Sequence, residues 1–560
     1  MTYNIDSDIY VATMYIDTSY STQQGKTYCR YLLRESYRDE GKVKHRTLAK
    51  LSHCTEEEIA AIKLALKHKG NLSALGAVED IKTKQGMRIG VVYTVNVLSE
   101  RIGLVKALGH HREGRLALWQ VIARLIDQGS RLSAVRLAES HAACDILGLD
   151  SFNEDTLYNN LAWLSRHQEA IEKRLFRQRY GDKAPELFLY DVTSSYLEGV
   201  KNILAAFGYN RDRKKGKMQL VIGLLTGPDG TPVAVRAFEG NTQDPKTVGE
   251  QVRTLANSFG VKEVTLVGDR GMIKQKEINC INDKYFHYIT AITKPQIKKL
   301  IKDGVFQMDL FDEKLCTLEW DDVRYILRCN PERAKELASN REAKLARVRQ
   351  LLKEKNVYVA EHSRATVEVA RRKVVKTTKQ LKIDTWVSVV SNGRAIELVI
   401  DEEVKKQAAQ LDGCYVIKTD LPVKVATAET IHDRYKDLAQ VERAFRTFKS
   451  GLEVRPAFVR KEESTRGHVF VVMLAYLLER ELYKYWLRLE VTVEEGIDEL
   501  GSLRGTEITI GQGTCQNVPE PTGLSKQLLN AAHINLPPAL PLRKVHVATR
   551  KKLVSERKLI

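Results

Sequence analysis

The sequence predicts an α/β protein built on a mixed β-sheet flanked by helices, and the order of its apolar segments is the first reason. An apolar strand over 186–199 is followed by strands over 220–226 and 232–240, which the turn GPDG joins as a hairpin. A helix with a proline in its first turn then spans 244–259, and a further apolar strand covers 263–272. Three adjacent strands, a helix and another strand are the core order of an RNase H-like fold.

Acidic residues on two of these strands are the second reason. Asp191 lies within the first apolar strand, and Asp269 follows the last one. A carboxylate in an apolar strand is costly unless it is paired or binds a metal ion, although a single one is commonly a cap or turn residue. We expect these two strands to be neighbours, so the two carboxylates should lie close together.

A third carboxylate comes from the segment Tyr435–Leu452, in which good helix formers and the glycine at 451 predict one helix. Four apolar residues recur at helical spacing and should face a core, namely Val441, Phe445, Phe448 and Leu452. Glu442, Arg446 and Lys449 form a second line about 100° around the helix. This line is either a solvated, salt-bridged face or a metal-binding glutamate beside cations that hold a phosphodiester.

Three carboxylates without neighbouring His or Cys suit a hard divalent cation. Asp191, Asp269 and Glu442 are therefore the predicted catalytic and metal-binding residues, with Mg²⁺ as the predicted cofactor and Mn²⁺ as a substitute. Two such ions about 3.5–4 Å apart activate a water or hydroxyl and stabilise the leaving oxygen in phosphodiester displacement. We expect no nucleotide or other organic cofactor.

The composition favours a nucleic-acid partner. Lys and Arg outnumber Asp and Glu by 89 to 71 in 560 residues, and this net charge of +18 favours binding to a polyanion such as DNA. A merely basic protein is the alternative. The longest apolar run is too short to cross a bilayer, no signal-peptide pattern begins the chain, and the eight scattered cysteines form no CxxC pair. We therefore expect a cytoplasmic protein with reduced thiols and no membrane partner.

Two segments precede the sheet. Residues 1–85 predict a small α+β segment with strands and one capped helix, and they show no chemistry. Residues 86–184 predict helices with a basic outer face at Arg166, Lys173, Arg174, Arg177 and Arg179. A DNA-binding helical module and a plain helical bundle both fit this second pattern.

The sheet itself is interrupted. Residues 185–274 hold its first part, and 275–410 are far longer than one crossover needs, so we expect a β-rich inserted domain there. The insertion contains one long basic helix at 331–355 and three strand-like pieces at 305–311, 316–329 and 385–393. Lys and Arg number 14 against 6 acids between 331 and 380, which indicates either a solvated face or a phosphate-contacting surface. Arg328, at the junction of strand and helix, is a candidate DNA contact.

Residues 411–490 complete the predicted core with a strand over 411–420, the helix of Glu442, and an apolar helix over 469–486. His468, at the start of that apolar helix, is either a phosphate contact or a capping or packing residue. Residues 491–560 predict a Gly- and Pro-containing linker followed by a basic tail.

These motifs resemble the DDE transposases of bacterial insertion sequences, in the group with a Y-R-E-K signature (insertion-sequence family four and its close relatives). The signature spaces Tyr, two residues, Arg, three residues, Glu, six residues and Lys. Tyr435, Glu442 and Lys449 stand at those spacings, while Leu438 occupies the Arg position. The strand LYDVTSSYLEG resembles the first-Asp motif of the family and VGDRGM the second, and the resemblance covers about 185–480.

The resemblance implies an RNase H-like core that cuts the ends of an element's terminal inverted repeats. The freed 3′-hydroxyl would then join to target double-stranded DNA by transesterification, and synapsis of two ends implies a homodimer. Tyr435 and Lys449 would contact phosphate near the scissile bond, with Arg446 as a weaker candidate. An RNase H-like nuclease without strand transfer and an inactive DNA-binding regulator are the alternatives.

Overall fold

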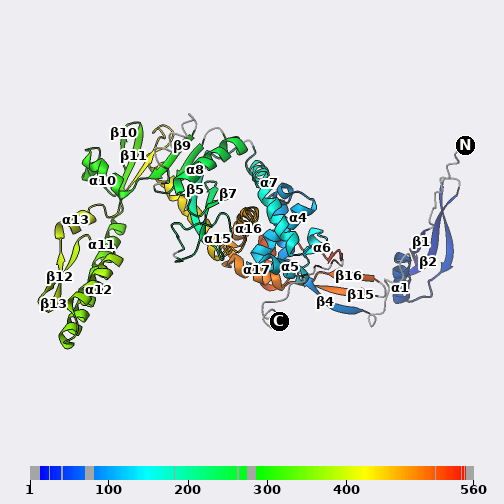
Figure 1. Cartoon of the computed structure of the whole chain (residues 1–560). Coiled ribbons are helices and arrows are strands. Elements are labelled where there is room, and N and C mark those ends of the chain that lie inside the picture. The colour runs from blue at the N-terminus through cyan, green and yellow to red at the C-terminus, as the bar shows by residue number, and fades with distance from the viewer. Residues whose placement is uncertain are drawn as a thin grey trace. The chain divides into compact units, whose positions relative to one another are not determined.

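The computed structural model describes residues 13–23, 26–39, 42–69, 81–181, 183–212, 214–261, 264–270, 272–273, 286–510, 513–543, 545, 547 and 549. Contacts within the chain divide it into two compact units (Figure 1). The small unit comprises 1–93, 140–148 and 498–546, and the large unit comprises 94–139, 149–497 and 547–560. Within the described ranges, no helix is both long and apolar enough to cross a membrane.

The small unit contains two antiparallel sheets. The first has the order β1-β2-β3, from β1 (Thr13–Gln23), β2 (Lys26–Asp39) and β3 (Lys42–Lys50). The second has the order β17-β16-β15-β4, from β17 (Ala539–Leu540), β16 (Gly513–Asn517), β15 (Arg504–Ile510) and β4 (Lys82–Arg88). The helices of this unit are α1 (Glu56–Lys67), α6 (Ala143–Leu147) and α18 (Gly523–Ala531).

Two predictions from the sequence can be compared with the elements of the small unit. The capped helix near the N-terminus is confirmed, because Thr55 and Glu58 form a capping box at the start of α1. The predicted linker after residue 490 is wrong, because helix α17 (Val493–Ser502) and strands β15 and β16 occupy its first part. β15 pairs with β4, which lies more than 400 residues earlier in the chain, so no local sequence pattern could predict this sheet.

The large unit is organised on an eight-stranded sheet in the order β10-β11-β14-β9-β8-β5-β6-β7. Its strands are β5 (Leu187–Tyr196), β6 (Gln219–Thr226), β7 (Pro232–Glu239), β8 (Val264–Gly268), β9 (Phe286–Ala291), β10 (Cys316–Trp320), β11 (Val323–Cys329) and β14 (Cys414–Thr419). β5, β8 and β9 run parallel, and the other pairs are antiparallel. The order β7-β6-β5-β8-β9 confirms the predicted α/β fold with an RNase H-like core.

The inserted region differs from the prediction in two ways. β9, β10 and β11 lie within 275–410 but extend the main sheet, so they are not part of a separate layer. Residues 305–311 do not form a strand, and a 3-10 turn covers Met308–Leu310 instead. The strand-like piece over 316–329 forms two paired strands, β10 and β11, and the predicted strand over 411–420 is confirmed as β14.

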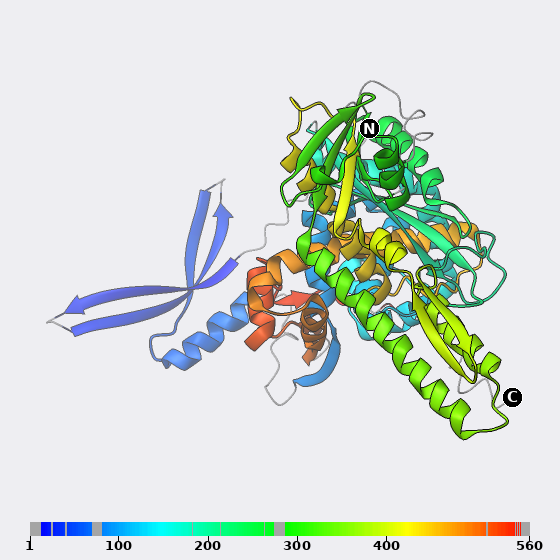
Figure 2. The same cartoon turned by 90° about the vertical axis from the view of Figure 1, so that its left-hand side faces the viewer.

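The remainder of the insertion forms its own small layer (Figure 2). It consists of α11 (Pro331–Glu361), α12 (Val367–Gln380), β12 (Val387–Asn392), β13 (Ala395–Ile400) and α13 (Glu402–Ala409). Leu345, Val348 and Trp386 are among the buried residues of a separate hydrophobic cluster in this layer. Because this cluster supplies its own apolar core, the layer can interrupt the chain without disturbing the main sheet.

Outside the inserted layer, the large unit contains a further set of helices and helical turns. They are α2 (Gly90–Arg101), α3 (Leu104–Leu108), α4 (Arg112–Ile126), α5 (Arg131–Ser140), α7 (Glu154–Tyr180), α8 (Asp244–Arg253), the π-helical turn η3 (Thr254–Phe259), α10 (Lys294–Lys302), α14 (Ala428–Lys436), α15 (Leu438–Ser450), α16 (Glu462–Trp486) and the 3-10 turn η5 (Leu487–Leu489). α16 packs against α4, α7 and β7, and residues 464–465 and 467–478 are buried. The predicted core-closing helix is therefore confirmed.

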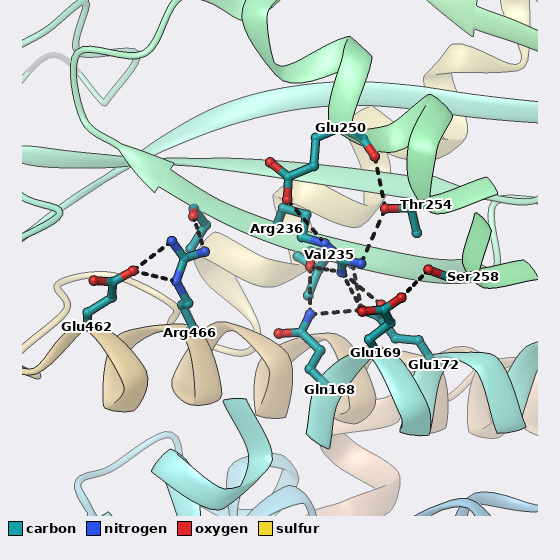
Figure 3. A network of polar contacts seen from close by, with 11 residues as sticks. Gln168, Glu169, Glu172, Val235, Arg236, Glu250, Thr254, Ser258, Glu462 and Arg466 are labelled. Atoms are coloured by element: carbon teal, nitrogen blue, oxygen red, sulfur yellow. Dashed lines mark hydrogen bonds and ion pairs between the residues drawn. The ribbon is translucent and has the colours of Figure 1, made fainter. Parts of the chain in front are cut away.

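A buried charged network fixes α7 to the edge of the sheet (Figure 3). Arg236 on β7 lies 2.8 Å from the Glu172 carboxylate, whose side chain is fully buried, and 3.5 Å from Glu250 on α8. Gln168 donates to the Val235 carbonyl at 2.7 Å. Removing one member would leave a buried charge without its partner, so the network specifies how α7 sits on β7.

Candidate active site

Strand pairing brings the two predicted aspartates together. Tyr190 of β5 pairs with Gly268 of the parallel strand β8, so the residues that follow them, Asp191 and Asp269, are neighbours across the two strands. Oδ1 of Asp191 accepts a hydrogen bond from the Val192 backbone N–H at 2.7 Å. Oδ1 of Asp269 accepts one from the backbone N–H of the next residue at 2.6 Å. Both carboxylates are thus anchored by the backbone.

Helix α15 supplies the third carboxylate. It packs against β5 through an apolar face that includes the buried Val441, Phe445 and Phe448, as the sequence predicts. Glu442 is exposed on this helix and lines the same cleft as Asp269. Burial, together with the negative charges of Asp269 and Glu442, raises the pKa of Asp191 to about 7. The three carboxylates therefore belong to one electrostatic cluster.

The predicted single helix over 435–452 is wrong, because two helices cover it. α14 ends at Lys436 and α15 begins at Leu438, with Asp437 between them. Asp437 keeps helical backbone angles (φ −60°, ψ −17°) and its side chain makes no capping hydrogen bond, so the break is a single residue between two helices. The predicted end at Gly451 is confirmed.

Tyr435 consequently approaches the site from α14. Its hydroxyl lies 3.5 Å from Oδ1 of Asp269. Burial raises the pKa of Tyr435, and the neighbouring Asp269 charge adds to the effect. The phenol therefore stays protonated at neutral pH and can donate a hydrogen bond to a phosphate oxygen or a carboxylate.

A cleft of about 520 Å³ opens in front of Asp269, Tyr435 and Glu442. Its lining includes the four basic residues Arg270, Lys294, Arg333 and Lys436. Sequence reasoning missed the last three as site residues, because they come from α10, α11 and α14 and no local spacing connects them. A cleft with carboxylates on one side and cations around it suits a polyanion that is held by its phosphates.

The other predicted phosphate contacts have different environments. Arg446 is exposed on α15. Lys449 is mostly buried and its Nζ lies 2.8 Å from Asp212. Arg328 is engaged inside the protein, since it bonds to Nε2 of His432 at 3.1 Å and donates to the Glu313 carbonyl at 3.0 Å.

His468 does not lie on a surface that DNA can contact. Its side chain is buried, with 7% of its surface exposed. Burial holds its pKa well below the usual range, and the charges of Arg124 and Arg131 lower it further. The imidazole is therefore neutral, and the packing interpretation replaces the phosphate contact.

The residues fit a divalent cation by their chemistry. In the described part of the chain, no group of three or more His, Cys, Asp or Glu side chains is arranged closely enough to coordinate a metal ion directly. Burial is the largest cause of the raised pKa of Asp191, and the charges of Asp269 and Glu442 add to it although Arg211 acts against it. A bound Mg²⁺ or Mn²⁺ would offset these negative charges, and carboxylate oxygens are the ligands that these ions prefer.

Comparison with known proteins gives a consistent result. Residues 182–478, more than half of the chain, match the family described as the transposase DDE domain. Residues 16–77 match the family described as the IS1634 family transposase, N-terminal domain. No curated protein matches the chain. Among solved structures, the chain is similar to a piggyBac transposase synaptic complex with hairpin DNA, at a TM-score of 0.35 and 7% identity, covering 69% of each chain.

Proposed function

The chain belongs to the DDE transposases, enzymes that cleave and transfer DNA with divalent cations, and from this premise we propose how its own residues do so. It would bind the terminal inverted repeats of its insertion sequence, cleave the element ends and join each 3′-hydroxyl to target DNA. The observation that carries the proposal is the convergence of Asp191, Asp269 and Glu442 from β5, β8 and α15.

In this proposal the three carboxylates hold the cation site. Two Mg²⁺ ions, when bound, would lower the pKa of the attacking water or 3′-hydroxyl and stabilise the leaving oxygen. The parallel pairing of β5 with β8 makes Asp191 and Asp269 neighbours, and the packing of the apolar face of α15 on β5 would hold Glu442 toward them. The protein contributes positioning on rigid elements, which is the main requirement of phosphoryl transfer.

The phosphates would be held by groups around the cleft. The protonated hydroxyl of Tyr435 lies beside Asp269, where it can donate to an oxygen of the scissile phosphate. Arg270, Lys294 and Lys436 would offset the charge of the adjoining phosphates. Arg446 is exposed one helical turn beyond Glu442 and is suited to a phosphate farther along the strand.

The signature residues support a place in the Y-R-E-K group. Tyr435, Glu442 and Lys449 keep the spacing of that signature, and Leu438 departs from it. Leu438 is mostly buried, with 7% exposed, and presents an apolar side chain at the wall of the cleft, so leucine supplies no phosphate contact there. Arg270 and Lys436, which line the cleft, are the proposed replacements.

Two ends must be brought together before strand transfer, so we propose a homodimer on DNA. The net charge of +18 supports binding of more than one duplex segment. A bacterial chain of this kind would work in the cytoplasm, at the nucleoid.

A strand-transfer assay tests the function. A labelled duplex that carries the element end is incubated with supercoiled target plasmid and Mg²⁺, using wild type and Asp191→Asn. We expect joined products with wild type and none with the variant. Cleavage without joined products would favour the nuclease, and binding without cleavage would favour the regulator.

A further inference from the structure

The sheet β1-β2-β3 has one face that α1 does not cover. Helix α1 packs on β1, and its Ile59 is buried. Lys63 of α1 lies over the ring of Tyr31, with its Nζ 5.8 Å from the ring centroid, which places Tyr31 on the helix side. Neighbouring side chains in a strand point to opposite faces, so Arg30 and Arg34 point away from the helix.

Contacts across the strands confirm which residues share this second face, called here the open face. Arg34 pairs with Asp17 at 2.8 Å. The Tyr15 hydroxyl lies 3.1 Å from Nδ1 of His45, and the Ser36 hydroxyl lies 2.9 Å from the same atom. Thr47 is opposite Arg34, as Tyr15 is, so these side chains form a connected polar surface across all three strands.

The open face is basic as well as polar. Arg30, Thr47 and Lys50 are exposed on it, and Lys50 is paired across from Leu32. Asp17 is the acid of this face among the described residues, and Arg34 already neutralises it. Across the three strands the described residues include eight Lys or Arg against three Asp or Glu. The basic residues of the open face are complementary to the phosphates of DNA.

The shape also suits a duplex. The three strands have 11, 14 and 9 residues, so the sheet is long and narrow, and in Figure 2 its strands extend beyond α1. The major groove of B-DNA is about 12 Å wide and admits a β-ribbon. Guanidinium and hydroxyl groups can contact base edges there as well as phosphates, so this face carries groups for both kinds of contact.

We propose that the open face of β1-β2-β3 enters the major groove of double-stranded DNA and reads the terminal inverted repeat of the element. The inference deepens the proposed function, because it assigns repeat recognition to a segment separate from the carboxylates. Arg34 and Thr47 are central on this face and would contact base edges, while Arg30 and Lys50 would hold phosphates.

Binding of the full chain to a labelled end duplex, in EDTA and against an unrelated duplex, tests the proposal. Arg30→Ala with Lys50→Ala should weaken end binding about 10- to 100-fold and flatten the salt dependence, because two phosphate contacts are lost. The matched control, Lys63→Ala with Lys67→Ala, removes the same charge from exposed positions of α1 and should change binding less than about threefold.

Thr47→Val distinguishes base recognition from electrostatic attraction to phosphates, because it removes a hydroxyl without changing charge or size. We expect it to lower the preference for the end duplex over the unrelated duplex by about fivefold or more, with unchanged thermal stability. The proposal would be overturned if the Lys63→Ala, Lys67→Ala control lost as much binding as the Arg30→Ala, Lys50→Ala variant. An unchanged preference for the end duplex in Thr47→Val would overturn it too. Binding of the end duplex in EDTA does not require the carboxylate site. If wild type bound the end duplex but failed to transfer strands in Mg²⁺, that result would count against the proposed function and not against this inference.

Discussion

The Nζ atom of Lys449 lies 2.8 Å from Oδ1 of Asp212, and Arg455 donates to the same oxygen. The Asp212 side chain is 1% exposed and the Lys449 side chain 13%. This contact joins α15 to the connection between β5 and β6, and a backbone N–H of Tyr196 also donates to Asp212. The last residue of the signature is therefore held by a buried carboxylate, which restrains the helix that carries Glu442.

Asp212→Asn tests this restraint. The substitution leaves Lys449 and Arg455 beside a neutral amide, and unpaired buried charges are costly, so we expect a loss of about 3 kcal/mol in the free energy of unfolding. Urea denaturation measures the change. Glu198→Gln is the matched control, because its pair with Lys217 is exposed on both sides and should contribute less than about 1 kcal/mol. Similar small effects of both variants would show that Asp212 does not restrain α15.

Leu438→Arg restores the Y-R-E-K signature in the sequence, but we do not expect it to restore a phosphate contact. Leu438 is 7% exposed and packs against the fold at the wall of the cleft, so the longer arginine must displace its buried contacts, and we expect destabilisation of about 2 kcal/mol and no gain in end cleavage. Ala439→Arg, at the next and exposed position, should change the Tm little. Calorimetry of the two variants distinguishes these outcomes, and a more active Leu438→Arg enzyme would contradict the buried placement.

Glu479 on α16 predicts how stability depends on pH. Burial raises its pKa from the ordinary 4.5 to about 7, although Arg480 acts in the opposite direction. The folded state therefore binds the proton more tightly, and about 3 kcal/mol of stability present below pH 4.5 is lost as the pH rises through 7. Glu479→Gln cannot titrate, so it should raise the Tm at pH 8 and leave it nearly unchanged at pH 4.5.

The control for that experiment is Glu463→Gln, because Glu463 is exposed on the first turn of the same helix. It should show no gain in Tm at pH 8. A Glu479→Gln variant that is less stable than wild type at pH 8 would mean that the charged carboxylate is stabilised in the fold, contrary to the burial argument.

The strands and carboxylates that share one sheet were predictable from the sequence. β5 and β8 are buried along nearly their whole length and each contains an apolar run, and an aspartate within or after such a strand stands out. The apolar stripe of α15 placed Glu442 in the same way. Each of these signals is local, which is why the sequence carries it.

Features that depend on distant partners were not predictable. β15 pairs with β4, and Asp212 meets Lys449 across more than 200 positions. Lys294 and Arg333 join the cleft only because α10 and α11 begin beside it. The break at Asp437 also escaped prediction, since both flanking segments have helical composition and one residue decides the boundary.

The central claim is that Asp191, Asp269 and Glu442 form one cation-dependent catalytic site. The most direct measurement is the rate of end cleavage in Mg²⁺ for wild type, Glu442→Gln and the control Glu403→Gln, whose side chain is exposed on α13. We predict that Glu442→Gln lowers the rate by about 10³-fold, while Glu403→Gln and the Tm of both variants stay close to wild type. Cleavage by Glu442→Gln at the wild-type rate would contradict the claim and leave Glu442 as a residue of a solvated helix face.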